Sequence, residues 1–106
     1  MTQAVERVNR SLVRSLYAID ATGSVTVSVA DGPTVVGHPS RIDRDEAGVR
    51  VEVCPYDGDA PQYRVRAHRT PTGWRPPYVE RRPLTEPWTR CGRLTDVTVS
   101  HRTPEE

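Results

Sequence analysis

The sequence predicts an α+β fold, in which one N-terminal helix precedes five or six antiparallel strands that form a small β-barrel or a strongly bent sheet. Three observations predict it. Apolar residues recur every three or four positions over residues 3–19, as on one face of a helix. From Gly23 onward, valines alternate with polar residues, which is the period of a strand. Turn sequences such as Asp31-Gly32 separate the alternating runs.

The segment 3–19 is the only helix that the sequence predicts. Its apolar stripe consists of Val5, Val8, Leu12, Leu16 and Ile19. Arginines at positions 7, 10 and 14 share a different face. We expect the stripe to pack on the sheet and the arginines to face water. A helix that reads DNA is the less favoured alternative, because no second helix follows at helix-turn-helix spacing.

Strands are predicted at residues 24–29, 34–44, 49–53 and 95–100, with their valines directed inward. Gly37 and Pro39 predict a bend or an interruption in the second of these, because proline cannot donate to a ladder and glycine often marks a bulge. The segment Asp57-Gly58-Asp59 is expected to be a loop. We expect residues 1–100 to form a single domain and residues 101–106 to form a polar tail.

A basic hairpin is predicted between residues 63 and 82. Alternation directs Arg64, Arg66 and His68 to one face of its first strand and Tyr63, Val65 and Ala67 to the other. Thr70-Pro71-Thr72-Gly73 suits a type I turn. A continuous register would then pair Arg69 with Trp74 and Val65 with Tyr78, and would bring Arg75, Val79 and Arg81 to the side of Arg64. Pro76, Pro77 and Pro83 predict that the returning arm is an edge strand or is only half paired.

Charge is segregated along the chain. Residues 61–93 carry eight arginines against Glu80 and Glu86, a net +6, whereas residues 21–60 carry three arginines against seven acids, a net −4. All fifteen basic residues are arginine, for which a GC-rich genome is the favoured explanation and bidentate anion binding the other. The asymmetry fits an anionic partner, and it equally fits a self-complementary surface that joins two subunits.

The apolar pattern and the cysteine content also predict the cellular location of the protein. No apolar run reaches the length of a membrane span, and no apolar signal-peptide core follows the N-terminus. The sequence therefore predicts a soluble, cytoplasmic protein without a membrane partner. Cys54 and Cys91 are too few for a disulfide scaffold, although one bridge between them stays open.

The run GSVTVSVADGPTVVGHPSRID, from Gly23 to Asp43, resembles the first motif of Sm and Sm-like proteins. The matching positions are Val25, Val27, Val29, Gly32, Val35, Gly37, Ile42 and Asp43. The resemblance implies a small β-barrel. It does not imply uridine recognition, because Glu46 and Ala47 stand where the family carries its Met-Asn pair, and Arg93-Leu94-Thr95 stands where an Ile-Arg-Gly element is expected. The segments VVGHPSRIDRDEAG and GRLTDVTV are also similar to strand turns of PRC-barrel domains.

Catalytic and metal chemistry find little support in the sequence. The candidate zinc ligands His38, Cys54, His68, Cys91 and His101 are isolated from one another. Asp43, Asp45 and Glu46 lack the spacing of a calcium loop, so a solvated turn is expected. We therefore predict no catalytic residue, no metal and no cofactor. A small enzyme or sensor that uses Cys54 or Cys91 is a distant alternative. Trp74 is expected in the core, and the role of Trp88 stays open.

The function predicted from these observations is a non-enzymatic binding module. Its arginine-rich hairpin would dock an anionic partner, most plausibly the backbone of single-stranded nucleic acid, without reading bases. The predicted contact residues are Arg64, Arg66, His68, Arg75 and Arg81. The alternative is a structural or adaptor subunit, in which the basic hairpin meets an acidic protein surface such as residues 43–59 of another copy in a homo-oligomer.

Overall fold

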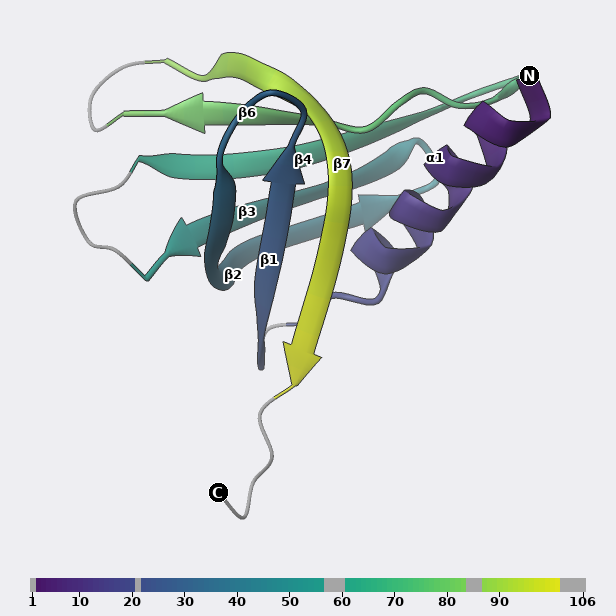
Figure 1. The fold of residues 1–106 in the computed structure, drawn as a ribbon. Helices are drawn as coiled ribbons and strands as arrows, with labels where there is room; N and C mark the ends of the chain where they lie inside the picture. Colours follow the sequence, from purple (N-terminus) through teal and green to yellow (C-terminus); the bar gives the residue numbers. More distant parts are fainter. Residues whose placement is uncertain (1, 21, 57–60, 84–86, 102–106) are drawn as a thin grey trace.

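The computed structural model describes residues 2–20, 22–56, 61–83 and 87–101. In it the strands with alternating valines form a closed barrel (Figure 1). The elements are α1 (Thr2–Tyr17), β1 (Gly23–Val29), β2 (Thr34–Asp45), β3 (Gly48–Pro55), β4 (Gln62–Thr70), β5 (Gly73–Trp74), β6 (Tyr78–Arg82) and β7 (Thr89–His101). Neighbouring strands pair in the order β1-β2-β3-β4-β6-β7, and β7 returns to β1. Every pairing is antiparallel. The predicted α+β small barrel is therefore confirmed.

Bulges let these strands curve enough to close. In β2 the register shifts between Pro39 and Arg41, where the sequence predicts a bend. In β7 the pairing skips Cys91 opposite β6 and Thr95 opposite β1. Figure 1 shows the result, a long curved β7 that leaves β6 and turns down along β1. This strand is longer than the predicted 95–100. Its first part has little of the apolar alternation from which a strand is predicted.

The core is made mainly of inward valines and one face of α1. Its buried apolar side chains are Leu12, Val13, Leu16, Ile19, Val25, Val27, Val29, Val35, Val49, Val51, Val53, Tyr63, Val65, Ala67, Val79, Leu94 and Val97. Each large side chain of this kind stabilises the fold by about 1.5–3 kcal/mol when fully buried. The partly buried Trp74 packs against this cluster, as the sequence predicts.

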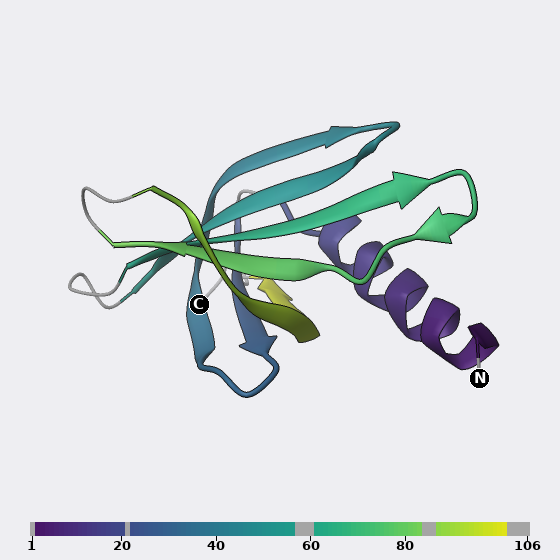
Figure 2. The ribbon, with the colours of Figure 1, turned by 90° about the horizontal axis from the view of Figure 1, so that it is seen from above.

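Helix α1 covers one open end of the barrel, beside the tips of the β2–β3 and β4–β5 hairpins (Figure 2). The Tyr17 hydroxyl donates to the carbonyls of Asp45 and Gly48, at 3.2 and 3.3 Å. The buried Asn9 amide donates to the Trp74 carbonyl at 3.4 Å. These contacts hold the helix to both hairpins.

The helical stripe differs from the predicted one at its first described position. Leu12, Leu16 and Ile19 are buried as expected, but the side chain of Val8 is 56% exposed. The buried positions are Asn9, Leu12, Val13 and Leu16, so the contact face is rotated toward Asn9 and Val13. The side chain of Val5 lies outside the described residues, as do the backbone and side chains of 57–60 and 102–106. Position 101, predicted as the start of the tail, still belongs to β7.

The returning arm of the basic hairpin is not an edge strand. Strand β6 lies between β4 and β7 and pairs with both. Its flanking prolines stay outside the five paired residues, so no ladder hydrogen bond is lost to them. The prediction of an edge or half-paired ribbon was therefore wrong for β6, because the prolines bound the strand and do not interrupt it, whereas the two-residue β5 pairs with β4 alone at the end of the strand order.

Candidate functional site

Strand β4 carries the basic face that the sequence predicts. Tyr63, Val65 and Ala67 are buried in the barrel, and the side chains between them point outward. These outward residues, Arg64, Arg66 and His68, are half-buried on the outer surface. The alternation prediction is therefore confirmed for this strand.

The predicted register of the hairpin holds only near its turn. Arg69 pairs with Trp74 as expected, but Val65 lies opposite Val79, and Arg66 lies opposite Tyr78. The segment Arg75-Pro76-Pro77 separates β5 from β6 and shifts the alternation by one residue. Val79, predicted on the basic face, is buried instead.

This shift changes which side chains share the outer face of β4. Tyr78 and Glu80 join Arg64 and Arg66, whereas Arg81 lies opposite the buried Tyr63 and is separated from them. The structure thus places Arg64, Arg66 and His68 on one face of β4, puts the exposed Arg75 beside His68, and separates Arg81 from them.

Arg64 is engaged within the protein. Its guanidinium lies 2.7 Å from a carboxylate oxygen of Glu80, and the two side chains are only 13% and 15% exposed. The same guanidinium lies over the ring of Trp88, 4.3 Å from the centroid, and Arg82 lies 4.8 Å from that centroid. Trp88 therefore serves as a cation-π platform for two arginines, which leaves Arg64 few donors for a ligand.

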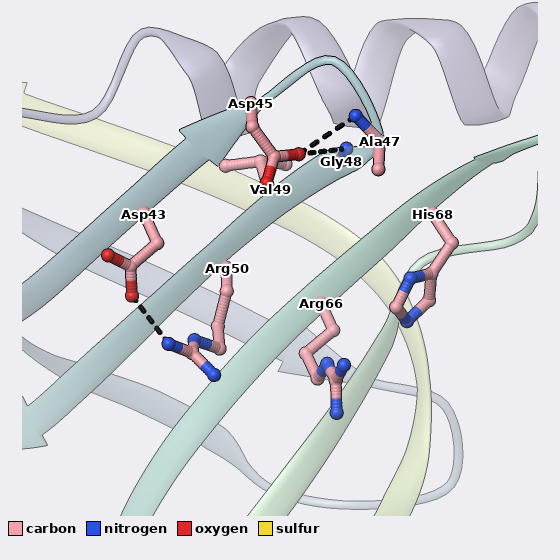
Figure 3. Close-up of a pocket in the computed structure, with 8 residues that line it drawn as sticks. All are labelled: Asp43, Asp45, Ala47, Gly48, Val49, Arg50, Arg66 and His68. Carbon is pink, nitrogen blue, oxygen red and sulfur yellow. Dashed lines mark hydrogen bonds and ion pairs between the residues drawn. The ribbon is translucent and has the colours of Figure 1, made fainter.

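A first hollow lies between the outer faces of β2, β3 and β4 and has a volume of about 310 Å³. Figure 3 shows Arg50, Arg66 and His68 side by side along it. Arg50 and Arg66 are directly opposed across the β3–β4 pair, an arrangement of like charges that costs stability. A carboxylate lies on the far side of each: Asp43 is 2.6 Å from Arg50, and Glu80 is 3.8 Å from Arg66.

The acids of this hollow are already bonded. Asp43 accepts from both Arg50 and Arg41, and these bonds, Arg50 first, lower the pKa of Asp43 below its ordinary value. The same contact raises the pKa of Arg50. Asp45 accepts from the backbone amides of Ala47 and Gly48 at 2.8 and 3.0 Å, which fixes the β2–β3 turn.

Donors in the same hollow have capacity left. Nε of Arg50 has no hydrogen-bond partner, but this atom is covered by the protein and is not open to a ligand. Arg66 lies 3.8 Å from the carboxylate of Glu80, beyond hydrogen-bond distance. The hollow can therefore accept an anion between two guanidinium groups.

A second hollow, of about 510 Å³, adjoins the first and shares His68 with it. Its other lining residues are Arg75, Pro76, Tyr78, Glu80 and Arg90. Nε2 of His68 lies 3.2 Å from the Tyr78 hydroxyl, and the two rings stack at 27° with centroids 5.9 Å apart. The exposed Arg90 lies over the Tyr78 ring at 4.6 Å.

Sequence reasoning missed Arg50, Tyr78 and Arg90 as members of this surface. Arg50 lies on a strand in the acidic region of the sequence. A continuous hairpin register treats Pro76 and Pro77 as paired residues and therefore places Tyr78 on the core face. The alternation of Tyr78, Val79 and Glu80 by itself carries the correct faces, because an isolated valine between polar residues indicates the inward position. Arg90 could not be placed, because the bulge at Cys91 alters the alternation of β7.

Of the remaining candidates for chemistry, His38 and Cys54 are cross-strand partners in the β2–β3 pair. Cys54 and Cys91 are free thiols on the non-neighbouring strands β3 and β7. Within residues 2–20, 22–56, 61–83 and 87–101, no three His, Cys, Asp or Glu side chains gather as a metal site. In the same part of the chain, no helix combines the length and apolarity that crossing a bilayer requires.

Comparison with known proteins gave no match: no family model, no curated protein and no solved structure is similar to this chain.

Proposed function

We propose that the protein is a non-enzymatic, cytoplasmic binding module whose outer β3–β4–β6–β7 face docks the phosphate backbone of single-stranded nucleic acid. One observation carries the proposal: Arg50 and Arg66 are directly opposed on β3 and β4 beside a hollow in which Asp43 is bonded to Arg50 and Asp45 to backbone amides, so that Arg66 has no carboxylate of the hollow bonded to it. The Sm-like resemblance supports a small barrel and adds no base recognition, since Glu46 and Ala47 replace the uridine-contacting pair.

A phosphate fits this arrangement for electrostatic reasons. Arg50 is bonded to Asp43 on one side, whereas Arg66 lies 3.8 Å from Glu80, so an anion between the two guanidinium groups gains charge-assisted contacts and offsets their mutual repulsion. Arg90 and Arg93, both exposed on β7, extend the cationic surface beyond the hollow. Because phosphates are the same in every nucleotide, such binding is weakly sequence-selective.

The direct test is fluorescence anisotropy with labelled single strands of several sequences, at a series of salt concentrations. About three to four engaged phosphates predict a slope of log affinity against log salt of roughly −2 to −3. Arg66→Gln together with Arg90→Gln should weaken binding to all sequences about equally and flatten the slope by about 1.4.

Arg10→Gln with Arg14→Gln is the matched control, because it removes the same charge from an exposed face of α1. This control should leave the slope unchanged. Absence of salt-dependent binding by the wild-type protein would refute the proposal, and an equal loss in the control would show that net charge alone attracts the strand.

A second candidate function is favoured by the charge segregation of the chain. Residues 21–60 carry a net −4 and residues 61–93 a net +6, so two copies, or this chain and another acidic protein, could join through these regions. In that case the same arginine variant would dissociate an oligomer or a protein complex in light scattering, and single strands would not bind.

A further inference from the structure

The second hollow has an aromatic floor of two rings. Tyr78 and His68 come from adjacent strands, stack at 27° and are joined by a 3.2 Å hydrogen bond. Both side chains are half-buried, so their backs rest on the barrel and part of each ring is accessible. The hollow measures about 510 Å³, within the roughly 300–1,000 Å³ of small-molecule sites. It can therefore hold a flat group against the rings.

The exposed side chain of Arg90 covers part of this floor. The guanidinium of Arg90 lies 4.6 Å from the centroid of Tyr78, and Arg90 is exposed. Among the described residues no carboxylate forms an ion pair with Arg90, whose contact is with the ring of Tyr78. An exposed cation-π contact is weak compared with base–aromatic stacking. A planar ligand can displace Arg90, which then becomes free to meet an anion nearby.

Two kinds of chemistry thus meet at His68. On one side of it lie the opposed arginines of the first hollow, and on the other lie the ring of Tyr78 and the exposed Arg75. A ligand that spans both hollows needs a negative group next to a flat aromatic group. A nucleotide unit of a single strand has this combination.

We propose that the second hollow receives one unstacked base of a single strand, which stacks on Tyr78 in place of Arg90 while the neighbouring phosphate lies between Arg50 and Arg66. The inference rests on the proposed function and names the form of its ligand. Single strands are bound and duplexes are not held at this site, because the bases of a duplex are stacked on each other. Every base has a π-face, so the site tolerates all four.

The test compares two probes of equal length and charge, a single-stranded oligothymidine and an abasic strand with the same phosphates. Wild-type protein should bind the oligothymidine about tenfold more tightly than the abasic strand, as one stacked base predicts. Tyr78→Leu should remove this difference and leave the abasic affinity unchanged. Tyr78→Phe keeps the ring and should preserve the difference.

The outcomes distinguish failure of base stacking at the second hollow from failure of nucleic-acid binding as a whole. Equal affinity of the wild-type protein for both strands would overturn base stacking while salt-dependent binding stands. An equal loss for both strands in Tyr78→Leu would also overturn it, because the tyrosine would then act through the fold. Absence of salt-dependent binding to either strand would refute the proposed function itself. Because the wild-type comparison needs no variant, an unfolded Tyr78→Leu would not prevent the test.

Discussion

At the scale of the residue, two arginines of β4 differ in how tightly they are bonded, because the adjacent strand β6 places Glu80 closer to one of them. Arg64 and Arg66 are equivalent in the sequence pattern, and both point outward from β4. Glu80 lies opposite Arg64, bonds it at 2.7 Å and leaves Arg66 at 3.8 Å. Arg64 therefore stabilises the barrel wall, and Arg66 keeps capacity for a ligand.

The two arginines should consequently respond differently to the same substitution. Arg64→Gln should lower the free energy of unfolding by about 2 kcal/mol, since it breaks a largely buried charged pair and a cation-π contact. Arg66→Gln should cost less than about 1 kcal/mol, as is usual for more exposed pairs. Urea unfolding of both variants measures this. Equal losses would show that the exposed fraction of the pair does not decide its contribution.

At the scale of the element, α1 covers the end of the barrel with one face. Leu16 is fully buried against the core, whereas Val8, eight residues earlier on the same predicted stripe, is 56% exposed. Among the described side chains of α1, those of Leu12, Val13 and Leu16 therefore contribute to stability by burial, together with the hydrogen bonds to the hairpin tips.

Truncation of these two positions tests that division. Leu16→Ala should destabilise the protein by about 2–5 kcal/mol, because it leaves a cavity in the core. Val8→Ala is the matched control and should change the stability by less than about 0.5 kcal/mol. Thermal and urea unfolding report both. A small effect of Leu16→Ala would mean that α1 is an arm that the barrel does not need.

The elements could be predicted because their signals are local, and the site could be predicted only in part. Apolar periodicity indicates the helix and the faces of β1, β3 and β4 without knowledge of their neighbours. Register across two prolines and a bulge depends on the closed barrel, so the inward Val79 and the outward Tyr78 were assigned to the wrong sides. Arg50 and Arg66 meet only because β3 pairs with β4, which no short-range pattern reveals.

At the scale of the whole molecule, closure of the barrel gathers strands from the basic part of the chain into one basic surface. Strands β4, β6 and β7 come from the basic part of the chain and lie side by side. Strand β3, from the acidic part, adds Arg50 next to them. The closed barrel thereby presents Arg50, Arg66, His68, Tyr78 and Arg90 on one wall, which reaches the hairpin tips that α1 contacts.

The most direct measurement of this central claim is an NMR titration of the labelled protein with a single-stranded oligonucleotide, followed through backbone amide shifts. We predict that the largest shifts occur at Arg50, Arg66, His68, Tyr78 and Arg90, with little change in α1. Shifts confined to the arginine face of α1, or the absence of any shift, would contradict a ligand site on the β3–β4–β6–β7 wall.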